Sequence, residues 1–218
     1  MWSTEDRQAF LEHMRQNKGQ IHEDPFADEI ERYASDPAYH TFLEVGTWNG
    51  LGSTQSFAKG FRQRTDPYVF YSLECNEEKS MHAASLYRDE PHMQILNEVL
   101  WNEEPADFYT TFPECLTDER FKQWNTIDLL NMKACPVFLA RTDLPAIFDV
   151  VLLDGGEFTT YYDYQCIKER CKVLLLDDTL TEKCKRIVEE LERDASWAIC
   201  ARGVTRNGYV VAEKRGAY

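Results

Sequence analysis

Three carboxylates follow two apolar segments of the chain that are typical of buried strands. Asp154 comes directly after the segment Asp149–Leu153. Asp177 and Asp178 are adjacent and come after Lys172–Leu176. Neighbouring strands of a parallel sheet lie about 5 Å apart, so the three side chains are expected to converge at one edge. No Lys or Arg stands within three residues of any of them. We therefore expect mutual repulsion, which a hard divalent cation with oxygen ligands would relieve.

The same acids have a second interpretation as helix caps. A helix is predicted at Thr181–Asp194, and either Asp178 or Thr179 could cap its first turn. In that case the cluster would serve the local backbone and would bind no metal.

A glycine-rich turn follows the first predicted strand. The segment FLEVGTWNGLGST runs from strand through loop to helix. Ligands of open α/β sheets bind at this place, and glycines let the backbone approach them closely. The spacing G-x-x-x-G-x-G differs from the dinucleotide pattern G-x-G-x-x-G, and no G-K-S/T follows, so dinucleotides and nucleoside triphosphates are both disfavoured. Glu44, just before the loop, would repel a pyrophosphate but suits a cationic ligand.

A further carboxylate follows the second predicted strand. Glu74 comes directly after Tyr68–Leu73 and 28 residues after Gly46. An acid in this position accepts hydrogen bonds from ribose hydroxyls, so it predicts a ribose-bearing cofactor without separating NAD from other nucleosides. Glu74 could also cap the helix predicted at Glu77–Tyr87, and the two roles are compatible.

The glycine loop and the acids together resemble a known family. The pattern E-x-G-x-x-x-G is similar to the first motif of class I S-adenosylmethionine-dependent methyltransferases, and the resemblance covers residues 40–214. It implies that the loop cradles the methionine and ribose parts of S-adenosylmethionine, with Glu44 positioning the amino group directly or through water. The end of the third strand, near Asn97, would contribute to the adenine pocket. The cofactor-binding residues that the resemblance implies are Glu44, Gly46, Thr47, Trp48, Gly50, Ser53, Glu74, Cys75, Asn97 and Asp154.

An acid after the fourth strand, with Asp-Asp after the fifth, resembles the metal site of O-methyltransferases of the catechol and macrocin type. The resemblance implies that Asp154, Asp177 and Asp178 bind Mg²⁺ or another divalent cation, which would hold and activate two adjacent hydroxyls of the acceptor. Relatives often carry Lys or His three residues after the first acid, where this chain has Glu157. Glu157 and Asp154 are therefore the predicted catalytic residues. Glu157 could instead be a fourth ligand or begin a helix.

The elements that must position these residues alternate between strand and helix. The alternation predicts an α/β fold with a doubly wound, mostly parallel, seven-stranded sheet of the Rossmann-like methyltransferase type. Asn207-Gly208 marks a turn between the last two strands, so the sheet is expected to end in an antiparallel hairpin. Strands are predicted at Thr41–Val45, Tyr68–Leu73, Met93–Leu96, Asp149–Leu153, Lys172–Leu176, Ala198–Ala201 and Tyr209–Ala212, and crossover helices at Ser53–Phe61, Glu77–Tyr87, Tyr161–Arg170 and Thr181–Asp194.

Two segments lie outside this regular pattern. Residues 1–38 are predicted to form an N-terminal helical preface to the cofactor-binding domain of residues 39–218, with one helix beginning near Ser3 and another at Pro25–Ala34. Residues 101–148, which include Trp124, do not fit a single crossover. They are interpreted either as an extended crossover over the sheet edge or as a substrate lid.

Composition restricts the partners of the protein. The chain has 218 residues, with 24 Lys and Arg against 38 Asp and Glu, for a net charge of −14. This balance disfavours binding to nucleic acid or to a membrane surface. The seven cysteines form no C-x-x-C pair, and neither a membrane span nor an apolar signal segment is evident, so we expect a cytoplasmic protein with reduced thiols. The favoured partner is a small-molecule or glycan acceptor with a vicinal diol or catechol, and a homo-oligomer stays open.

Two other functions stay open at this point. An NAD-dependent oxidoreductase would need the dinucleotide glycine spacing and a catalytic Tyr-x-x-x-Lys. Tyr164 and Lys168 have that spacing, but they lie on the wrong side of the fifth strand for this chemistry. A non-catalytic nucleoside-binding or assembly protein would keep the fold and bind the cofactor without depending on Asp177 or Asp178.

Overall fold

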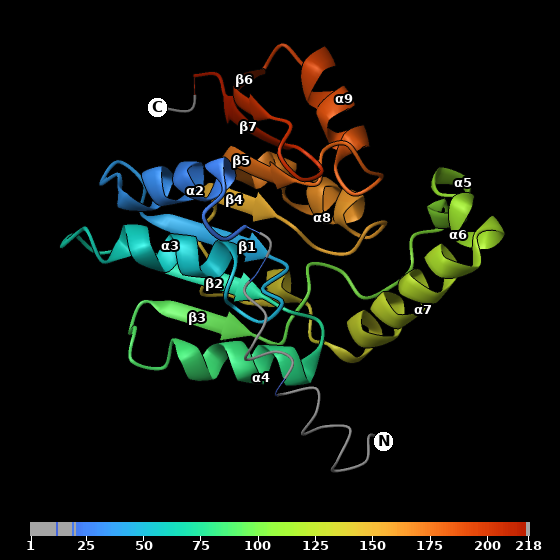
Figure 1. Cartoon of the computed structure of the whole chain (residues 1–218), viewed down its shortest axis with the longest axis horizontal. Helices are drawn as coiled ribbons and strands as arrows, with labels where there is room; N and C mark the ends of the chain where they lie inside the picture. The colour runs from blue at the N-terminus through green and yellow to red at the C-terminus, as the bar shows by residue number, and fades with distance from the viewer. Residues whose placement is uncertain (1–11, 13–18, 20, 217–218) are drawn as a thin grey trace.

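The computed structural model describes Glu12, Gly19 and residues 21–216 of the chain. Its centre is a seven-stranded sheet with the order β3-β2-β1-β4-β5-β7-β6 (Figure 1). The first five strands of this order pair in parallel, and β7 pairs antiparallel with both β5 and β6. The predicted α/β sheet with its terminal hairpin is therefore confirmed. The strands are β1 (Thr41–Val45), β2 (Val69–Leu73), β3 (Met93–Leu96), β4 (Phe148–Leu153), β5 (Cys171–Asp177), β6 (Trp197–Gly203) and β7 (Tyr209–Lys214).

One face of the sheet is covered by α2 (Pro25–Ser35) and α3 (Ser53–Phe61). Phe42 of β1 and Phe70 of β2 point to this face and pack against Phe57 of α3, with ring centroids 6.1 and 5.0 Å apart. Side chains alternate along a strand, so the residues next to Phe42 and Phe70 point to the opposite face. Both faces of the central strands are thus apolar, as expected for parallel strands.

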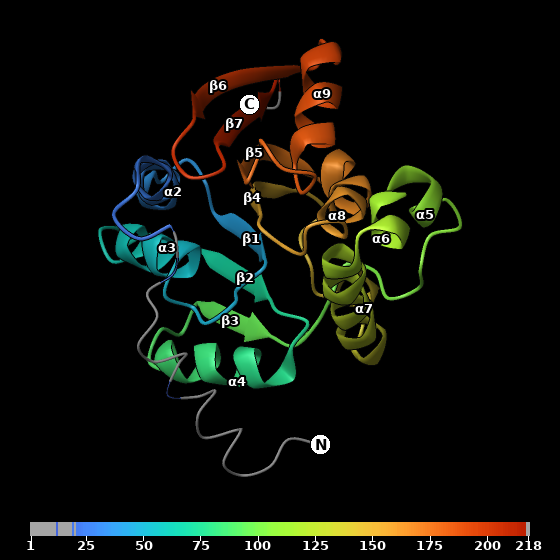
Figure 2. The same cartoon turned by 45° about the vertical axis from the view of Figure 1, so that its right-hand side comes forward.

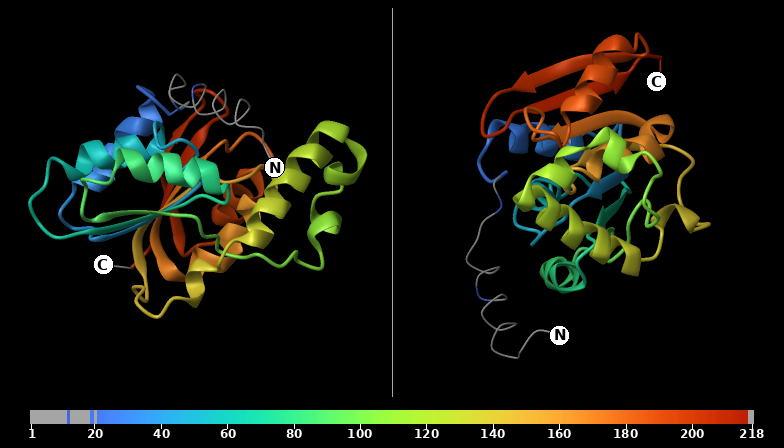
Figure 3. Two further views of the ribbon diagram at one scale, coloured as in Figure 1. Left: turned by 90° about the horizontal axis from the view of Figure 1, so that it is seen from below. Right: turned by 90° about the vertical axis from the view of Figure 1, so that its right-hand side faces the viewer.

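The opposite face is covered by α8 (Thr160–Ile167) and α9 (Lys185–Arg193), which contribute buried residues to a second apolar layer. A short 3-10 turn, η2 (Lys168–Arg170), leads from α8 into β5. The crossover from β2 to β3 is α4 (Glu77–Leu86), which lies at the end of the sheet far from the β6–β7 hairpin (Figure 3).

Residues 101–148 form an extended crossover made of α5 (Phe108–Thr111), α6 (Glu114–Thr117), α7 (Glu119–Ala134) and the 3-10 turn η1 (Phe138–Ala140). These helices gather beside α8 at one side of the sheet (Figure 2). The fully buried rings of Phe108 and Phe112 anchor the segment against Tyr162 of α8. Trp124, by contrast, is 45% exposed. The interpretation of the segment as a lid stays a prediction.

The predicted N-terminal preface is described only in its second half. The helix expected near Ser3 lies outside the described residues. The helix expected at Pro25–Ala34 is present as α2, one residue longer. Asp24 caps it by accepting a 2.9 Å hydrogen bond from the backbone N–H of Phe26. Within Glu12, Gly19 and residues 21–216, the helices are too short or too polar to span a membrane.

Register explains why the predicted site residues meet. Val45 of β1 pairs with Leu153 of β4, and Leu153 pairs with Leu176 of β5. The residues that follow these positions therefore leave the sheet at the same edge and at the same level. This edge lies where the strand order reverses between β1 and β4, which is the position at which ligands of open α/β sheets bind.

Candidate active site

A cavity of about 320 Å³ lies at this edge of the sheet. Its walls come from the loop after β1, the ends of β2, β4 and β5, and the helix α7. The volume is in the range of small-molecule sites. The cavity is lined by many of the residues predicted from the sequence: Gly46, Thr47, Trp48, Ser53, Glu74, Cys75, Asp154, Asp177 and Asp178.

The glycine loop has a backbone that requires glycine at its first position. Gly46 has φ +98°, and a Cβ added there would lie 2.0 Å from the carbonyl oxygen of Asp154. A side chain at this position would therefore separate the ends of β1 and β4. Trp48 also has a positive φ of 51°, so the loop curls tightly around the space in front of it. Because Gly46 has no side chain, the backbone of the loop can approach a ligand closely at this position.

Glu74 closes the loop from the side of β2. Its Oε2 accepts a 2.8 Å hydrogen bond from the backbone N–H of Trp48, and its Oε1 accepts one of 2.9 Å from Asn76. Burial raises the pKa of Glu74, although Lys79 opposes the shift. The cap of α4 is Asn76, which accepts from the Lys79 N–H, so the alternative in which Glu74 caps this helix is wrong. Each oxygen of Glu74 accepts one backbone hydrogen bond and keeps a second lone pair, so the carboxylate can still accept from a ligand in the cavity that it lines.

Glu44 occupies a different place from the one predicted. It is fully buried beneath the loop and does not line the cavity. Its Oε2 accepts hydrogen bonds from the hydroxyls of Thr54, at 2.7 Å, and Ser72. Ser72 in turn shares a 2.5 Å hydrogen bond with Thr47, which does line the cavity. Burial raises the pKa of Glu44 to about 6. Glu44 thus supports the loop from below, and a direct contact with a ligand amino group is not offered by this geometry, whereas the predicted contact through water stays a prediction.

Two other predicted residues, Gly50 and Asn97, also lie behind the cavity wall. The hydroxyl of Tyr87 donates to the carbonyl oxygen of Gly50, which has φ +77° and shapes the loop. The side-chain amide of Asn97 donates to the carbonyl oxygens of Glu74 and Cys75 at 2.8 and 3.1 Å. Gly50 and Asn97 therefore position the loops, and neither lines the cavity.

Glu157, the predicted proton acceptor, accepts a hydrogen bond from the backbone instead. Its Oε1 accepts a 3.0 Å hydrogen bond from the N–H of Glu182, in the turn before α9. It does not line the cavity. The prediction of a catalytic base at this position is not supported, because the side chain is directed at a neighbouring loop.

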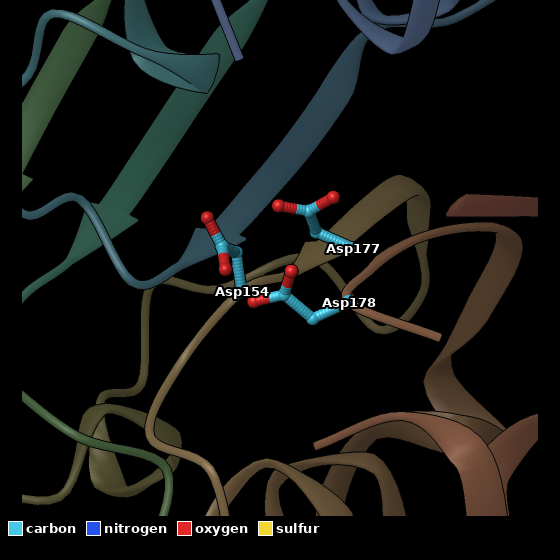
Figure 4. A group of neighbouring side chains, drawn as sticks. All are labelled: Asp154, Asp177 and Asp178. Carbon is cyan, nitrogen blue, oxygen red and sulfur yellow. The ribbon is translucent and has the colours of Figure 1, made fainter. Parts of the chain in front are cut away.

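The three aspartates of strands β4 and β5 do converge, as expected. One oxygen of each lies within 4.8 Å of the others, and Figure 4 shows the three carboxylates facing one another. The expectation that they lack a nearby cation is wrong. The ammonium group of Lys183 lies 2.7 Å from Oδ1 of Asp154 and 2.6 Å from Oδ2 of Asp178.

Asp177 has a cation of its own. Arg206, from the turn between β6 and β7, donates two hydrogen bonds of 2.9 Å to its two carboxylate oxygens. The same guanidinium contacts Asp24 at 3.2 and 3.3 Å. Asn207 donates to Oδ1 of Asp178 at 3.1 Å. The cap interpretation does not explain this cluster, because its carboxylates are engaged by side chains. A divalent ion does not fit the cluster as it stands, since Lys183 occupies the position between Asp154 and Asp178.

Burial governs the electrostatics of this cluster. Burial lowers the pKa of Lys183, but the negative charges of Asp154 and Asp178 outweigh it and leave that pKa above its ordinary value. Burial raises the pKa of Asp154, and Lys183 offsets only part of the shift. For Asp178 the ammonium and the Asn207 amide outweigh burial, and the pKa is lowered. Asp154 is therefore the better proton acceptor of these two carboxylates.

Two acids of the cavity wall were missed by the sequence analysis. Asp128 comes from α7 and Asp163 from α8. Burial raises the pKa of Asp128 to about 6 and that of Asp163 to about 8. Neither follows a strand, so no local signal marks them as site residues. Lys183 and Arg206 were missed as partners of the aspartates because both reach the cluster from loops beyond the strand ends.

The pair Tyr164 and Lys168, which suggested an oxidoreductase, lies elsewhere. Neither residue lines the cavity. Tyr164 is buried, and the Lys168 ammonium lies 5.3 Å from the centre of its ring. The two are part of a separate hollow with Trp197 and Glu190. They cannot act on a ligand held by the glycine loop.

The fold is similar to that of several solved O-methyltransferases. No protein-family model matches the chain, and no curated protein matches it in sequence. Solved structures match over nearly the whole chain. An O-methyltransferase from Bacillus cereus in complex with SAH has 13% identity and a TM-score of 0.58, with 95% of this chain and 91% of that chain covered.

Two further structures have the same TM-score. A putative caffeoyl-CoA O-methyltransferase from Staphylococcus aureus is 14% identical, with 98% of this chain and 93% of that chain covered. An O-methyltransferase from Streptomyces achromogenes, involved in tomaymycin synthesis and in complex with SAM, is 14% identical, with coverage of 95% and 87%. At this level of identity the similarity establishes the shared fold.

Proposed function

We propose that the protein is an S-adenosylmethionine-dependent O-methyltransferase that acts on a hydroxyl of a small molecule or sugar. The observation that carries the proposal is Glu74. It is a buried acid that lines the cavity, ends β2, and is hydrogen-bonded to the backbone of a glycine loop whose spacing disfavours a dinucleotide. The similar structures that contain SAM or SAH have the same fold and support this choice.

The cavity residues fit the cofactor in chemistry. The backbone of Gly46–Trp48 leaves room beside β1, and Glu74 offers carboxylate oxygen to ribose hydroxyls. Cys75, Val99 and Met132 line an apolar part of the wall that suits a flat base. When bound, S-adenosylmethionine supplies an electrophilic methyl group. The residues of the chain have to hold an acceptor hydroxyl in line with that group and remove its proton.

Asp154 is the proposed proton acceptor. It lies at the end of β4 in the cavity wall, and burial raises its pKa toward that of a useful base. Lys183 stays paired with Asp178 when Asp154 takes the proton, so the positive charge of the site is retained. Asp177 is held by Arg206 and keeps its place through the reaction.

The position of Lys183 argues against the predicted assistance of the reaction by a metal ion. A divalent ion could bind the three aspartates only if Lys183 left the position it now occupies. The proposed reaction therefore contains no metal step. A catechol or vicinal diol stays the favoured acceptor class by resemblance, and a cytoplasmic location stays a prediction.

Calorimetry and a methyl-transfer assay test the proposal. We expect binding of S-adenosylmethionine and of its demethylated product, and no binding of NAD. We also expect transfer of a radiolabelled methyl group from the cofactor to at least one member of a panel of catechols and sugars. Binding of NAD without a response to either sulfur nucleoside would contradict the proposal. Cofactor binding with no transfer to any hydroxyl, thiol or amine would favour the non-catalytic nucleoside-binding alternative.

A further inference from the structure

The acidic cluster of Asp154, Asp177 and Asp178 contains two cations that belong to the chain itself. Lys183 bridges Asp154 and Asp178, and Arg206 binds Asp177 through two parallel hydrogen bonds. The Lys183 side chain is only 12% exposed, so it is a fixed part of the site rather than a mobile surface residue.

The position of the Lys183 ammonium, as well as its charge, determines whether a divalent ion can bind the cluster. A divalent ion held by one oxygen from each aspartate would have to lie between Asp154 and Asp178, about 2.0–2.1 Å from its ligands. Lys183 Nζ lies between the same two carboxylates, within 2.7 Å of both. The ammonium and a divalent ion cannot occupy this position together, because their positive charges would be only a few ångström apart.

Arg206 leaves little freedom for the third ligand. Both oxygens of Asp177 already accept from the guanidinium, which is itself fixed by Asp24. Bidentate pairs of this kind are geometrically specific. Asp177 would have to share its oxygens between Arg206 and the metal. The positive charge of Arg206 would also weaken the binding of any cation there.

We propose that Lys183 is the resident cation of this cluster and closes it to divalent metal ions, so that the protein has the carboxylates of a metal site but binds no metal there. The proposal concerns the apo protein and does not depend on the proposed methyl transfer. Replacing Lys183 with an uncharged residue should then create a metal site from carboxylates already in place.

The test uses the full chain without cofactor and Mn²⁺ as the probe, followed by electron paramagnetic resonance of the free ion and by calorimetry. We expect no site in the wild type tighter than millimolar. Lys183→Met, which keeps a long unbranched side chain, should bind one Mn²⁺ at least about 100-fold more tightly, as expected when a unit charge is removed from beside the ion. Adding Asp178→Asn to this variant should remove the gain and so locate the ion.

The matched control is Lys185→Met, two residues further on. Lys185 is 54% exposed and lies 4.0 Å from Glu182, so its loss changes the net charge equally without touching the cluster. We expect this variant to behave as the wild type. Lys183→Arg, which keeps the positive charge, should still exclude Mn²⁺.

Two outcomes would overturn the proposal. One is micromolar binding of Mn²⁺ by the wild type that is lost in Asp178→Asn, which would mean that Lys183 yields to the ion. The other is a folded Lys183→Met variant that binds no Mn²⁺, which would mean that the cluster is not a latent metal site. If Lys183→Met does not fold without the ion, recovery of its folded far-UV circular dichroism spectrum on addition of Mn²⁺ supports the proposal. A variant that stays unfolded with Mn²⁺ would contradict it.

Discussion

The backbone N–H of Trp48 donates a 2.8 Å hydrogen bond to Oε2 of Glu74. This contact joins the glycine loop after β1 to the acid that ends β2, and both groups line the cavity. The protein itself therefore holds Glu74 and the glycine loop in place relative to each other. A ligand that contacts both the glycine loop and Glu74 therefore binds to a site that is already assembled before it arrives.

Removing this acid should weaken cofactor binding selectively. We expect Glu74→Ala to reduce the affinity for the demethylated cofactor by ~1–3 kcal/mol, which is typical of hydrogen bonds to a charged group. Calorimetry measures the change directly. Glu77→Ala is the control, because this neighbouring acid is exposed on the first turn of α4. Equal affinities of the Glu74 variant and the wild type would rule out a contact with the ligand.

Gly46→Ala should be among the most destabilising small substitutions in the chain. The added Cβ would meet the Asp154 carbonyl oxygen and adjoining backbone, which cannot move without separating β1 from β4. Gly216→Ala has a similar positive φ of 73° but open space around it, so it should cost only the left-handed penalty of ~1–2 kcal/mol. Urea unfolding of the two variants compares them. A Gly46 variant no less stable than the Gly216 variant would mean that the close approach is not real.

The sequence predicted the sheet and its edge well because short apolar runs and glycine turns are local signals. The segments Thr41–Val45, Met93–Leu96 and Ser53–Phe61 have the predicted bounds. Convergence of Asp154 with Asp177 followed from strand adjacency, which the alternation of helices and strands sets. Contacts between residues that are distant in the chain leave no such local signal, so the partners of the predicted site residues could not be predicted.

The failures have a common physical cause. Glu44 follows the family pattern in sequence, yet hydroxyls of Thr54 and Ser72 draw its carboxylate beneath the loop. Lys183 lies five residues beyond Asp178 and reaches back across the turn before α9, a contact that no local sequence pattern indicates. Arg206 stands next to the Asn207-Gly208 turn, and the turn signal does not indicate which carboxylates its guanidinium reaches. An ion pair forms only where two charged groups lie close together in space. The sequence determines those positions only through the complete fold.

Breaking the contact between Arg206 and Asp177 should destabilise the protein strongly. Arg206→Met would leave Asp177 and Asp24 buried without their partner, and removing one member of a buried pair typically costs ~3–5 kcal/mol. Arg202→Met breaks a pair with Glu192 in which both side chains are about half exposed, so it should cost less than ~1 kcal/mol. Thermal and urea unfolding provide the measurement. A double variant that also carries Asp177→Asn should recover part of the loss, and additive losses would show that the two residues are not coupled.

Asp163 should make the stability of the protein fall as the pH rises. Burial raises its pKa from 3.8 to about 8 in the folded protein. Between these values the unfolded chain has released a proton that the folded protein still holds, so this group lowers the unfolding free energy by up to ~1.4 kcal/mol per pH unit. Its contribution to stability is complete below the lower pKa and is lost as the pH approaches the higher one.

The Asp163→Asn variant tests this assignment because an amide cannot ionise. Its stability relative to the wild type should increase between about pH 5.5 and about pH 8 in urea unfolding. Asp89→Asn makes the same charge change at a side chain that is 95% exposed and serves as the control. A constant difference between the Asp163 variant and the wild type across this range would contradict the raised pKa.

Two aromatic residues of the extended crossover should differ in how much they contribute to stability. Phe112 is fully buried, so Phe112→Ala should cost ~3–5 kcal/mol of unfolding free energy. Trp124 is 45% exposed, and Trp124→Ala should cost much less. If the segment acts as a lid, the Trp124 variant should change acceptor affinity while cofactor affinity stays the same. A loss of stability in the Trp124 variant as large as that in the Phe112 variant would mean that Trp124 is part of the core.

Arg206 binds Asp24, a residue 182 positions away in the chain, as well as Asp177. During synthesis β1, β4 and β5 leave the ribosome before the turn that carries Arg206. A chain that ends before that turn lacks the guanidinium that pairs with both Asp24 and Asp177. One side chain of the β6–β7 turn therefore links α2 to the end of β5, and shortening the chain by its last hairpin would leave two buried carboxylates without their common cation.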